Sequence, residues 1–172
     1  MKSVNNPLKV SIRYSRLKDA PRFFAILSNP NFKYLSVSVK TLKDEEKWLR
    51  ACPSQRRKNI EWNYAILGAG RVIGAVGIKI NRARAHIGEI GYFLEEQYWG
   101  QGLTTRAVKL IEREAFTKLG VSRLEIVMRP ENRGSEKVAI KNNYQKEGLL
   151  RKLDKDKQGK LRDFWLYAKI RK

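Results

Sequence analysis

Apolar and polar residues alternate along several short stretches of the chain, which is the pattern of half-buried β-strands. Between residues 9 and 16, for example, Val10, Ile12 and Tyr14 are separated by polar side chains, so one face of the segment is apolar. The turn Gly68–Ala69–Gly70 joins two such segments directly, which predicts a hairpin. Extended segments are predicted over residues 9–16, 61–67, 71–80, 87–94, 124–128, 145–153 and 161–170.

Four other stretches are predicted to be helices. The longest begins near Leu103, carries apolar residues at helical spacing and ends at Gly120. Another begins at Thr41, whose spacing to Asp44 is that of a capping box, and residues 53–58 are predicted to be a basic connection after it. Shorter helices are predicted over residues 18–27 and 135–143. Because no linker interrupts the pattern, residues 1–172 are predicted to form a single α/β domain.

The composition fits a domain that folds without disulfides or metal. A chain of 172 residues is long enough to bury a core of its own. Cys52 has no second cysteine to pair with, and one histidine with one cysteine does not make a metal site. No apolar run is long enough to span a bilayer, and residues 1–6 contain no apolar signal-peptide core. A cytoplasmic location without membrane association is therefore expected.

The chain is strongly basic, with 37 Lys and Arg residues, 17 Asp and Glu residues and a formal net charge of +20. The excess lies at the ends: residues 1–40 contain 8 basic and 1 acidic residues, residues 141–172 contain 11 and 4, and residues 61–100 contain 4 and 4. Such ends attract phosphates, acidic proteins or RNA and repel polycations. A surface that is simply well solvated explains the same counts, and only the positions in space separate the two interpretations.

The segment Gln97–Tyr98–Trp99–Gly100–Gln101–Gly102 lies between a predicted strand and the longest predicted helix. Two glycines within three residues allow a tight turn with exposed main-chain N–H groups, and the following helix adds the positive end of its dipole. The arrangement predicts an anion site suited to a pyrophosphate. The alternative is a glycine-rich turn that binds nothing.

Three blocks of sequence carry a resemblance to a known family. The spacing Gln97-x-x-Gly100-x-Gly102 resembles the acyl-CoA pyrophosphate loop of the GNAT superfamily of N-acetyltransferases. Residues 85–94 resemble the family's fourth strand, most closely in the ribosomal-protein N-terminal acetyltransferase branch (RimJ/RimL-like), and residues 129–139 resemble that branch's Asn-x-x-Ser segment. The resemblance implies the GNAT fold, a mixed and mostly antiparallel central sheet flanked by about four helices.

The resemblance also implies acetyl-CoA as co-substrate and assigns its contacts. The amides of Phe93 and Leu94 are expected to meet the pantetheine and the thioester carbonyl, and the amides from Gly100 to Thr105 are expected to hold the pyrophosphate. The cofactor-binding set predicted in this way is Tyr92, Phe93, Leu94, Gln97, Gly100, Gln101, Gly102, Leu103, Thr104, Thr105 and Asn132.

Ser135 is predicted to protonate the departing thiolate of CoA, because it matches the serine that the branch uses for this step. Other GNAT enzymes place a tyrosine one helical turn later, where this chain has Ala139. Asn132 and Ser135 also fit a second interpretation, since both residue types commonly cap helices.

Glu89 is the predicted general base, acting directly or through water, because it lies on the strand that leads to the presumed active centre. A strand carboxylate paired with an arginine is the structural alternative. The branch places a glutamate before the final hairpin, where this chain offers Asp154 or Asp156, and His86 has a pKa suited to neutral pH. The base therefore remains open between these residues.

The sequence thus predicts an enzyme that moves acetyl from acetyl-CoA to a primary amine in a ternary complex, most favourably a protein N-terminal α-amine. The charge disfavours polyamine acceptors and suits contact of the basic ends with an acidic protein or a ribosome. The alternatives are a GNAT-fold module that binds RNA or ribosomes without turnover, and a GNAT enzyme for a small-molecule amine. The oligomeric state stays open, a dimer included.

Overall fold

The computed structural model describes residues 8–35, 41–156 and 158–171, and its central feature is one seven-stranded sheet in the order β1-β2-β3-β4-β5-β7-β6. Neighbouring strands are antiparallel except β4 and β5, which are parallel. The mixed, mostly antiparallel sheet expected from the sequence is therefore confirmed. The strands are β1 (Val10–Tyr14), β2 (Glu61–Gly68), β3 (Arg71–Ile80), β4 (Ile87–Leu94), β5 (Arg123–Met128), β6 (Gln145–Lys155) and β7 (Leu161–Ile170). The α-helices are α1 (Ala20–Leu27), α2 (Leu42–Arg57), α3 (Leu103–Lys118) and α4 (Arg133–Lys141).

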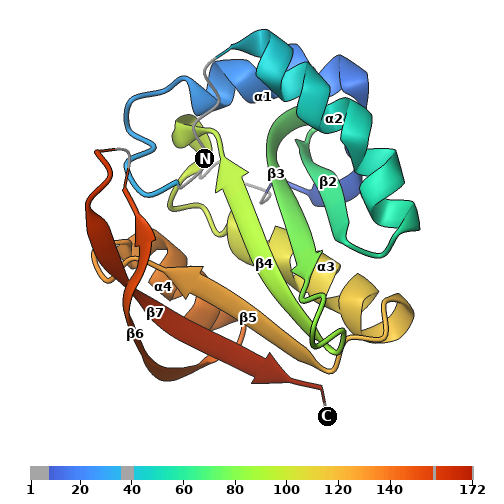
Figure 1. The fold of residues 1–172 in the computed structure, drawn as a ribbon. Helices are drawn as coiled ribbons and strands as arrows, with labels where there is room; N and C mark the ends of the chain where they lie inside the picture. The colour runs from blue at the N-terminus through green and yellow to red at the C-terminus, as the bar shows by residue number, and fades with distance from the viewer. Residues whose placement is uncertain (1–7, 36–40, 157, 172) are drawn as a thin grey trace, which may run out of the picture.

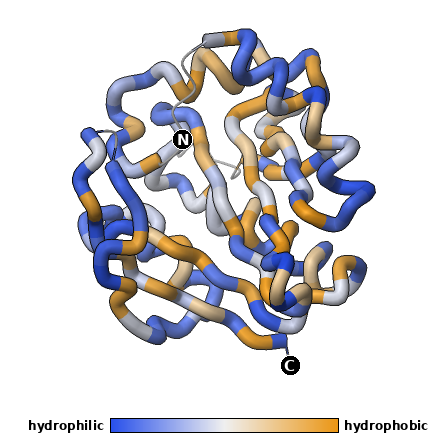
Figure 2. The backbone as a smooth tube through the Cα atoms, viewed as in Figure 1, coloured by the Kyte–Doolittle hydropathy of each residue, from blue (hydrophilic) through white to orange (hydrophobic). Residues whose placement is uncertain are grey.

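The helices cover the two faces of the sheet in pairs. α1 and α2 lie over one face of β2 and β3, while α3 and α4 pass behind the sheet on the other face (Figure 1). Successive side chains of a strand point to opposite faces of the sheet, so the same strands contribute apolar residues to a core on each face. Residues such as Ile78 and Ile90 pack beneath α3, and Ala75 and Phe93 pack beneath α1 and α2. Hydrophobic segments accordingly run along the inner strands in Figure 2, with hydrophilic segments in the outer loops.

Several turns have the local geometry that their sequence predicts. The Thr41 side chain accepts a hydrogen bond from the Asp44 amide, and the Asp44 carboxylate accepts one from the Thr41 amide, as in a capping box. The hairpin between β2 and β3 turns at Ala69 and Gly70, which have φ of 47° and 77°. Two successive positive φ values match the right-handed twist of the flanking strands.

Residues 53–58 are not the connection that the sequence predicted. α2 continues through Pro53 to Arg57, so the prediction of a helix end before the proline is wrong. A proline removes one main-chain hydrogen bond from a helix. Here the preceding turn is held by Leu49 and Cys52, which are 2% and 3% exposed in the core beneath α2. Tertiary packing therefore outweighs the local cost of the proline.

Candidate active site

The candidate site is the opening between β4 and β5. These parallel strands are paired only from Ile87 to Glu89 on β4, and they diverge beyond that point (Figure 1). The remainder of β4 therefore has a main-chain edge without a neighbouring strand on the β5 side. An exposed edge in the middle of a sheet offers N–H and C=O groups to a ligand that lies along it.

The register decides which amides face the opening. Hydrogen-bonded pairs between β3 and β4 occur at alternate residues: the Glu95 amide donates to the Ile73 carbonyl, and two residues earlier Phe93 lies opposite Ala75. The main-chain groups of Phe93 thus face β3, whereas those of Tyr92 and Leu94 face the opening. The register favours Leu94 over Phe93 as a main-chain donor to a ligand.

The N-terminus of α3 lies close in sequence to this open edge. Gly100 and Gly102 have φ of 76° and 74°, in the left-handed region that the sequence predicted for glycines. Gly102 is the N-cap of α3, and within the described chain no side chain caps this helix. The first N–H groups of α3 therefore point out of the helix without a side-chain acceptor, as an anion-binding helix start requires.

Contacts that the sequence did not reveal hold the loop before α3. The Trp99 indole N–H donates to the Leu94 carbonyl, with 2.6 Å between nitrogen and oxygen, and the Gln101 amide donates to the Gln97 carbonyl at 2.9 Å. Arg22 of α1 forms an ion pair with Glu95. Nothing in the sequence pointed to either contact: Arg22 pairs with a residue 73 positions away, and the Trp99 indole bonds a main-chain carbonyl that has no side-chain signature.

Ser135 and Tyr92 meet across the opening. The Asn132 side chain accepts a hydrogen bond from the Ser135 amide at 3.1 Å, so Asn132 caps α4 as its capping interpretation predicted. The Tyr92 hydroxyl lies 3.5 Å from the Ser135 carbonyl oxygen. Burial raises the pKa of Tyr92 to about 12, and hydrogen bonding with Ser135 opposes this shift. Two hydroxyl groups thus lie together at the open edge.

Glu89 lies on the other face of the sheet from Tyr92. It shares the face of Gly91 and Phe93, where an added Cβ at Gly91 would meet no atom within 4 Å. The Glu89 side chain is exposed, yet surrounding protein displaces water from its carboxyl group and raises its pKa. Lys79, opposite on β3, opposes this rise, and Glu125, opposite on β5, adds to it. No arginine holds Glu89 among the described residues.

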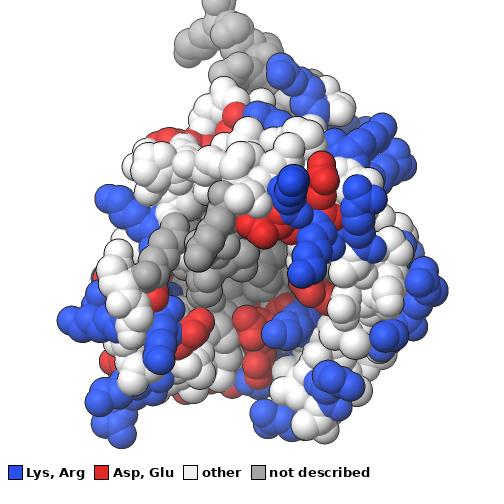
Figure 3. Space-filling model, turned by 45° about the horizontal axis from the view of Figure 1, so that its top comes forward, with Lys and Arg blue, Asp and Glu red and all other residues white. Residues whose placement is uncertain are grey.

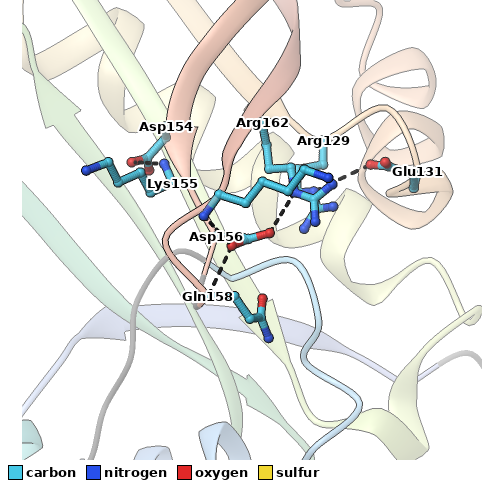
Figure 4. Close-up of polar contacts among 8 residues, drawn as sticks. Arg129, Glu131, Asp154, Lys155, Asp156, Gln158 and Arg162 are labelled. Atoms are coloured by element: carbon cyan, nitrogen blue, oxygen red, sulfur yellow. Dashed lines mark hydrogen bonds and ion pairs between the residues drawn. The ribbon is translucent and has the colours of Figure 1, made fainter.

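The other candidate bases have structural roles. The Asp156 carboxylate accepts hydrogen bonds from Arg162 at 2.6 Å and from the Gln158 and Lys160 amides, so it organises its own hairpin (Figure 4). The hydrogen bond from Arg162 does most to lower the pKa of Asp156, and the two amides lower it further. Asp154 caps the neighbouring Lys155 amide.

His86 lies at the other end of β4 from the opening. Its main-chain carbonyl accepts hydrogen bonds from the amides of Ser122 and Arg123, at 2.9 and 3.1 Å. These bonds lie where the pairing of β4 with β5 begins. Its imidazole is exposed. We therefore retain Glu89 as the candidate base.

A model of the acetyltransferase (GNAT) domain family matches residues 9–145. The chain belongs to the GNAT family of acetyltransferases. GNAT acetyltransferases use acetyl-CoA, and the open edge of β4 beside an uncapped helix start has the groups that such a ligand needs. The protein is therefore an acetyl-CoA-dependent N-acetyltransferase.

Relatives of this GNAT acetyltransferase occur in bacilli. It is 28% identical over 169 residues to the uncharacterized N-acetyltransferase p20 of Bacillus licheniformis, an alignment that covers 95% of this chain and 94% of the relative. It is 34% identical over 115 residues to the probable N-acetyltransferase YjcK of Bacillus subtilis. That alignment covers 65% of this chain and 64% of the relative. These names agree with the activity and leave the acceptor open.

The fold is shared with ribosomal-protein acetyltransferases. RimL, a ribosomal L7/L12 α-N-protein acetyltransferase in complex with coenzyme A, has a TM-score of 0.86 at 20% identity over 94% of both chains. The ribosomal-protein-S5-alanine acetyltransferase of Vibrio fischeri has a TM-score of 0.83 at 23% identity over 94% of this chain and 92% of that chain. The microcin C7 self-immunity acetyltransferase MccE, in complex with acetyl-CoA and AMP, has a TM-score of 0.84 at 22% identity, covering 94% and 92%.

β1, from the basic N-terminal part of this GNAT enzyme, and β6, from its basic C-terminal part, form the two opposite edges of the sheet. On the face shown in Figure 3, acidic side chains gather toward the middle and most Lys and Arg side chains lie toward the periphery. In the described part of the chain, no helix is long and apolar enough to cross a bilayer. Nor do three or more His, Cys, Asp or Glu side chains of those residues come together as metal ligands.

Proposed function

We propose that this acetyltransferase transfers acetyl directly from acetyl-CoA to a protein N-terminal α-amine within a ternary complex. The observation that carries the proposal is the arrangement about β4. Tyr92 and Ser135 lie on the α3 and α4 side of the sheet, Glu89 lies on the α1 and α2 side, and the opening beyond Glu89 connects the two. Acetyl-CoA and the acceptor amine can therefore approach the opening from opposite faces of the sheet and react directly, without a covalent enzyme intermediate.

Each proposed role follows from position. Glu89 accepts a proton from the acceptor ammonium, directly or through water, and its raised pKa brings it closer to the operating pH of a base. The free amine attacks the thioester carbon while the Leu94 N–H stabilises the developing oxyanion. The carbon–sulfur bond then breaks, and Ser135 donates a proton to the thiolate. The amides from Gly100 to Thr105 hold the pyrophosphate.

The choice of an N-terminal α-amine rests on the neighbours in fold and on charge. Among those neighbours, RimL is named as an α-N-protein acetyltransferase of ribosomal L7/L12, and the Vibrio fischeri protein is named as a ribosomal-protein-S5-alanine acetyltransferase. The net charge of +20 disfavours polyamines at the encounter stage. MccE shares the fold and is named for a different activity, so the acceptor needs a direct test.

The test uses matched peptides that begin with Ser or Ala and contain one internal lysine. One form has a free N-terminus and the other is formylated there, and mass spectrometry locates any acetyl group. We expect acetylation of the α-amine in the free form only, and its loss in a Ser135→Ala variant. Acetylation of lysine in both forms, or of spermidine in preference to either peptide, would overturn the proposed acceptor while leaving the transferase activity intact.

A further inference from the structure

A cavity of about 800 Å³ lies against β1, at the edge of the sheet. It is lined by residues 12–17, which form the end of β1 and the segment that follows, by the second half of α2 and by the end of α3. Two strands, β2 and β3, separate β1 from β4, which places the cavity about 14 Å from the proposed acetyl-transfer site by strand spacing alone. Its volume is within the range of pockets that hold small molecules, and none of the acetyl-CoA or acceptor residues proposed above lines it.

The charged groups of the cavity are mostly cationic. Arg13 is held by Asp19 in a bidentate pair at 2.7 Å, and Lys118 pairs with Glu114 at 2.9 Å. Arg50 lies 3.9 Å from Glu46, and the remaining guanidinium groups, Arg16 and Arg56, have no ion-pair partner within 4 Å in the described chain. A guanidinium group binds planar oxyanions through two parallel hydrogen bonds. The cavity therefore offers an anion two guanidinium groups that form no ion pair with other described residues.

An apolar and aromatic floor lies beneath these cations. The Arg56 guanidinium lies 4.0 Å from the centre of the Tyr14 ring, and that ring is 4.9 Å from the ring of Tyr64. Leu17, which is 39% exposed, adds an aliphatic surface. Such a surface favours a ligand whose charged group is attached to an apolar or aromatic body.

Ser15 supplies an independent sign of a ligand. Its side chain lines the cavity and is 7% exposed, and its hydroxyl has no hydrogen-bond partner among the described residues. Buried hydroxyl groups are nearly always hydrogen-bonded, because an unpaired one carries a desolvation cost. A ligand oxyanion that accepts from this hydroxyl would remove the cost.

We propose that this cavity binds a small organic anion, a carboxylate on an aromatic or apolar body, at a site separate from the acetyl-transfer centre. The carboxylate contacts Arg16, Arg56 and Ser15, and the apolar body lies against Tyr14 and Leu17.

An added peptide strand fits the site less well, because the main chain at the end of β1 is already occupied. The Tyr14 carbonyl accepts a hydrogen bond from the Arg13 side chain. The Arg16 amide donates to the Asp19 carboxylate, and the Arg16 carbonyl accepts from the Asp19 amide.

The test compares benzoate with benzamide, which has the same shape and no charge. Amide shifts of ¹⁵N-labelled protein are followed at saturating acetyl-CoA, so that the α3 anion site is filled. We expect benzoate to shift residues 12–17 and 49–56 with a dissociation constant on the order of 1 mM, and benzamide to bind at least about tenfold more weakly. Arg56→Gln should weaken benzoate about tenfold, and Arg57→Gln, next to it on α2 but outside the cavity, should not.

Ser15→Ala separates ligand binding from a structural role. We expect it to weaken benzoate about threefold to tenfold while leaving the melting temperature unchanged or higher, because the hydroxyl makes no bond in the protein alone. Equal binding of benzoate and benzamide, or no shift in residues 12–17, overturns the proposal. It is also overturned if a hexaglutamate peptide binds through Arg56 and benzoate does not, since the cavity would then be a docking site for acidic proteins.

Discussion

The phenol oxygen of Tyr92 on β4 lies 3.5 Å from the main-chain carbonyl oxygen of Ser135 at the start of α4. This contact joins the two walls of the opening between β4 and β5. In the proposed mechanism, the Tyr92 phenol and the Ser135 hydroxyl are the two candidate donors of the proton that the departing thiolate needs. The pKa of Tyr92, about 12, keeps its phenol protonated at neutral pH, so both groups are chemically able to donate.

Substitution of each hydroxyl identifies the donor. If Ser135 protonates the thiolate, Ser135→Ala lowers kcat by about a hundredfold or more, while Tyr92→Phe lowers it less than about fivefold. Both variants should still bind acetyl-CoA, because neither substitution touches the α3 helix start. Steady-state rates with a thiol reagent for free CoA measure the difference. The reverse order of effects would assign the proton to Tyr92.

A pair of glycine variants tests the pyrophosphate site. Gly102→Glu and Gly159→Glu each place a carboxylate at a residue with φ near 75°, the values being 74° and 79°. Each substitution costs about 1–2 kcal/mol of backbone strain. Acetyl-CoA at a hundredfold its Kd should stabilise the parent and Gly159→Glu by about 2.7 kcal/mol. Thermal unfolding should show no such gain for Gly102→Glu, and an equal gain would place acetyl-CoA elsewhere.

The pH profile of kcat/KM tests Glu89. Activity requires the deprotonated base, so it should fall as pH drops through the raised pKa of this group. Because Glu125 raises that pKa and Lys79 lowers it, Glu125→Gln should move the acid limb to lower pH and Lys79→Met to higher pH. Glu89→Gln should lower kcat/KM by about a hundredfold or more. If neither substitution moves the acid limb of the profile, the base is a group other than Glu89.

A buried carboxyl group in α2 makes stability depend on pH. Glu45 is 3% exposed, one of its oxygens has no partner in the described chain, and desolvation raises its pKa from 4.5 to about 7. Between these values the folded protein holds a proton that the unfolded chain has lost. The free energy of unfolding should therefore fall as pH rises through this window, by about 2 kcal/mol after the α2 dipole offsets part of the shift.

Denaturant titrations from pH 4.5 to 8 measure this effect. Glu45→Gln should remove the dependence and exceed the parent in stability at pH 8. Glu46→Gln, at the partly exposed neighbouring residue, is the matched control and should follow the parent. A parallel decline in all three proteins would show that Glu45 does not cause it.

Local patterns in the sequence predicted most of the elements. Period-two alternation located the strands, and Gly102, Gly120 and Thr41 marked helix ends because their φ values or side chains act on adjacent residues. The helix end before Pro53 was wrong because core packing of Leu49 and Cys52, which are distant in sequence from their partners, outweighs the proline.

The candidate site was predictable only in part. The glycine loop and the Asn132 cap are local features, and the sequence located both. The Trp99 contact with Leu94 and the Arg22 pair with Glu95 had no such signal. Sequence also suggested the Phe93 amide as a ligand contact, whereas the pairing of β3 and β4 turns that group away from the opening.

The sequence by itself determined the family, the glycine turn before α3 and the order of strands and helices, because these depend on residue type and spacing. Only the tertiary structure decided that β4 and β5 part after Glu89, that Tyr92 meets Ser135, and that a basic cavity lies beside β1. The physical reason is that each of these features depends on contacts between segments far apart in the chain. Their energies come from packing and register, which no single segment encodes.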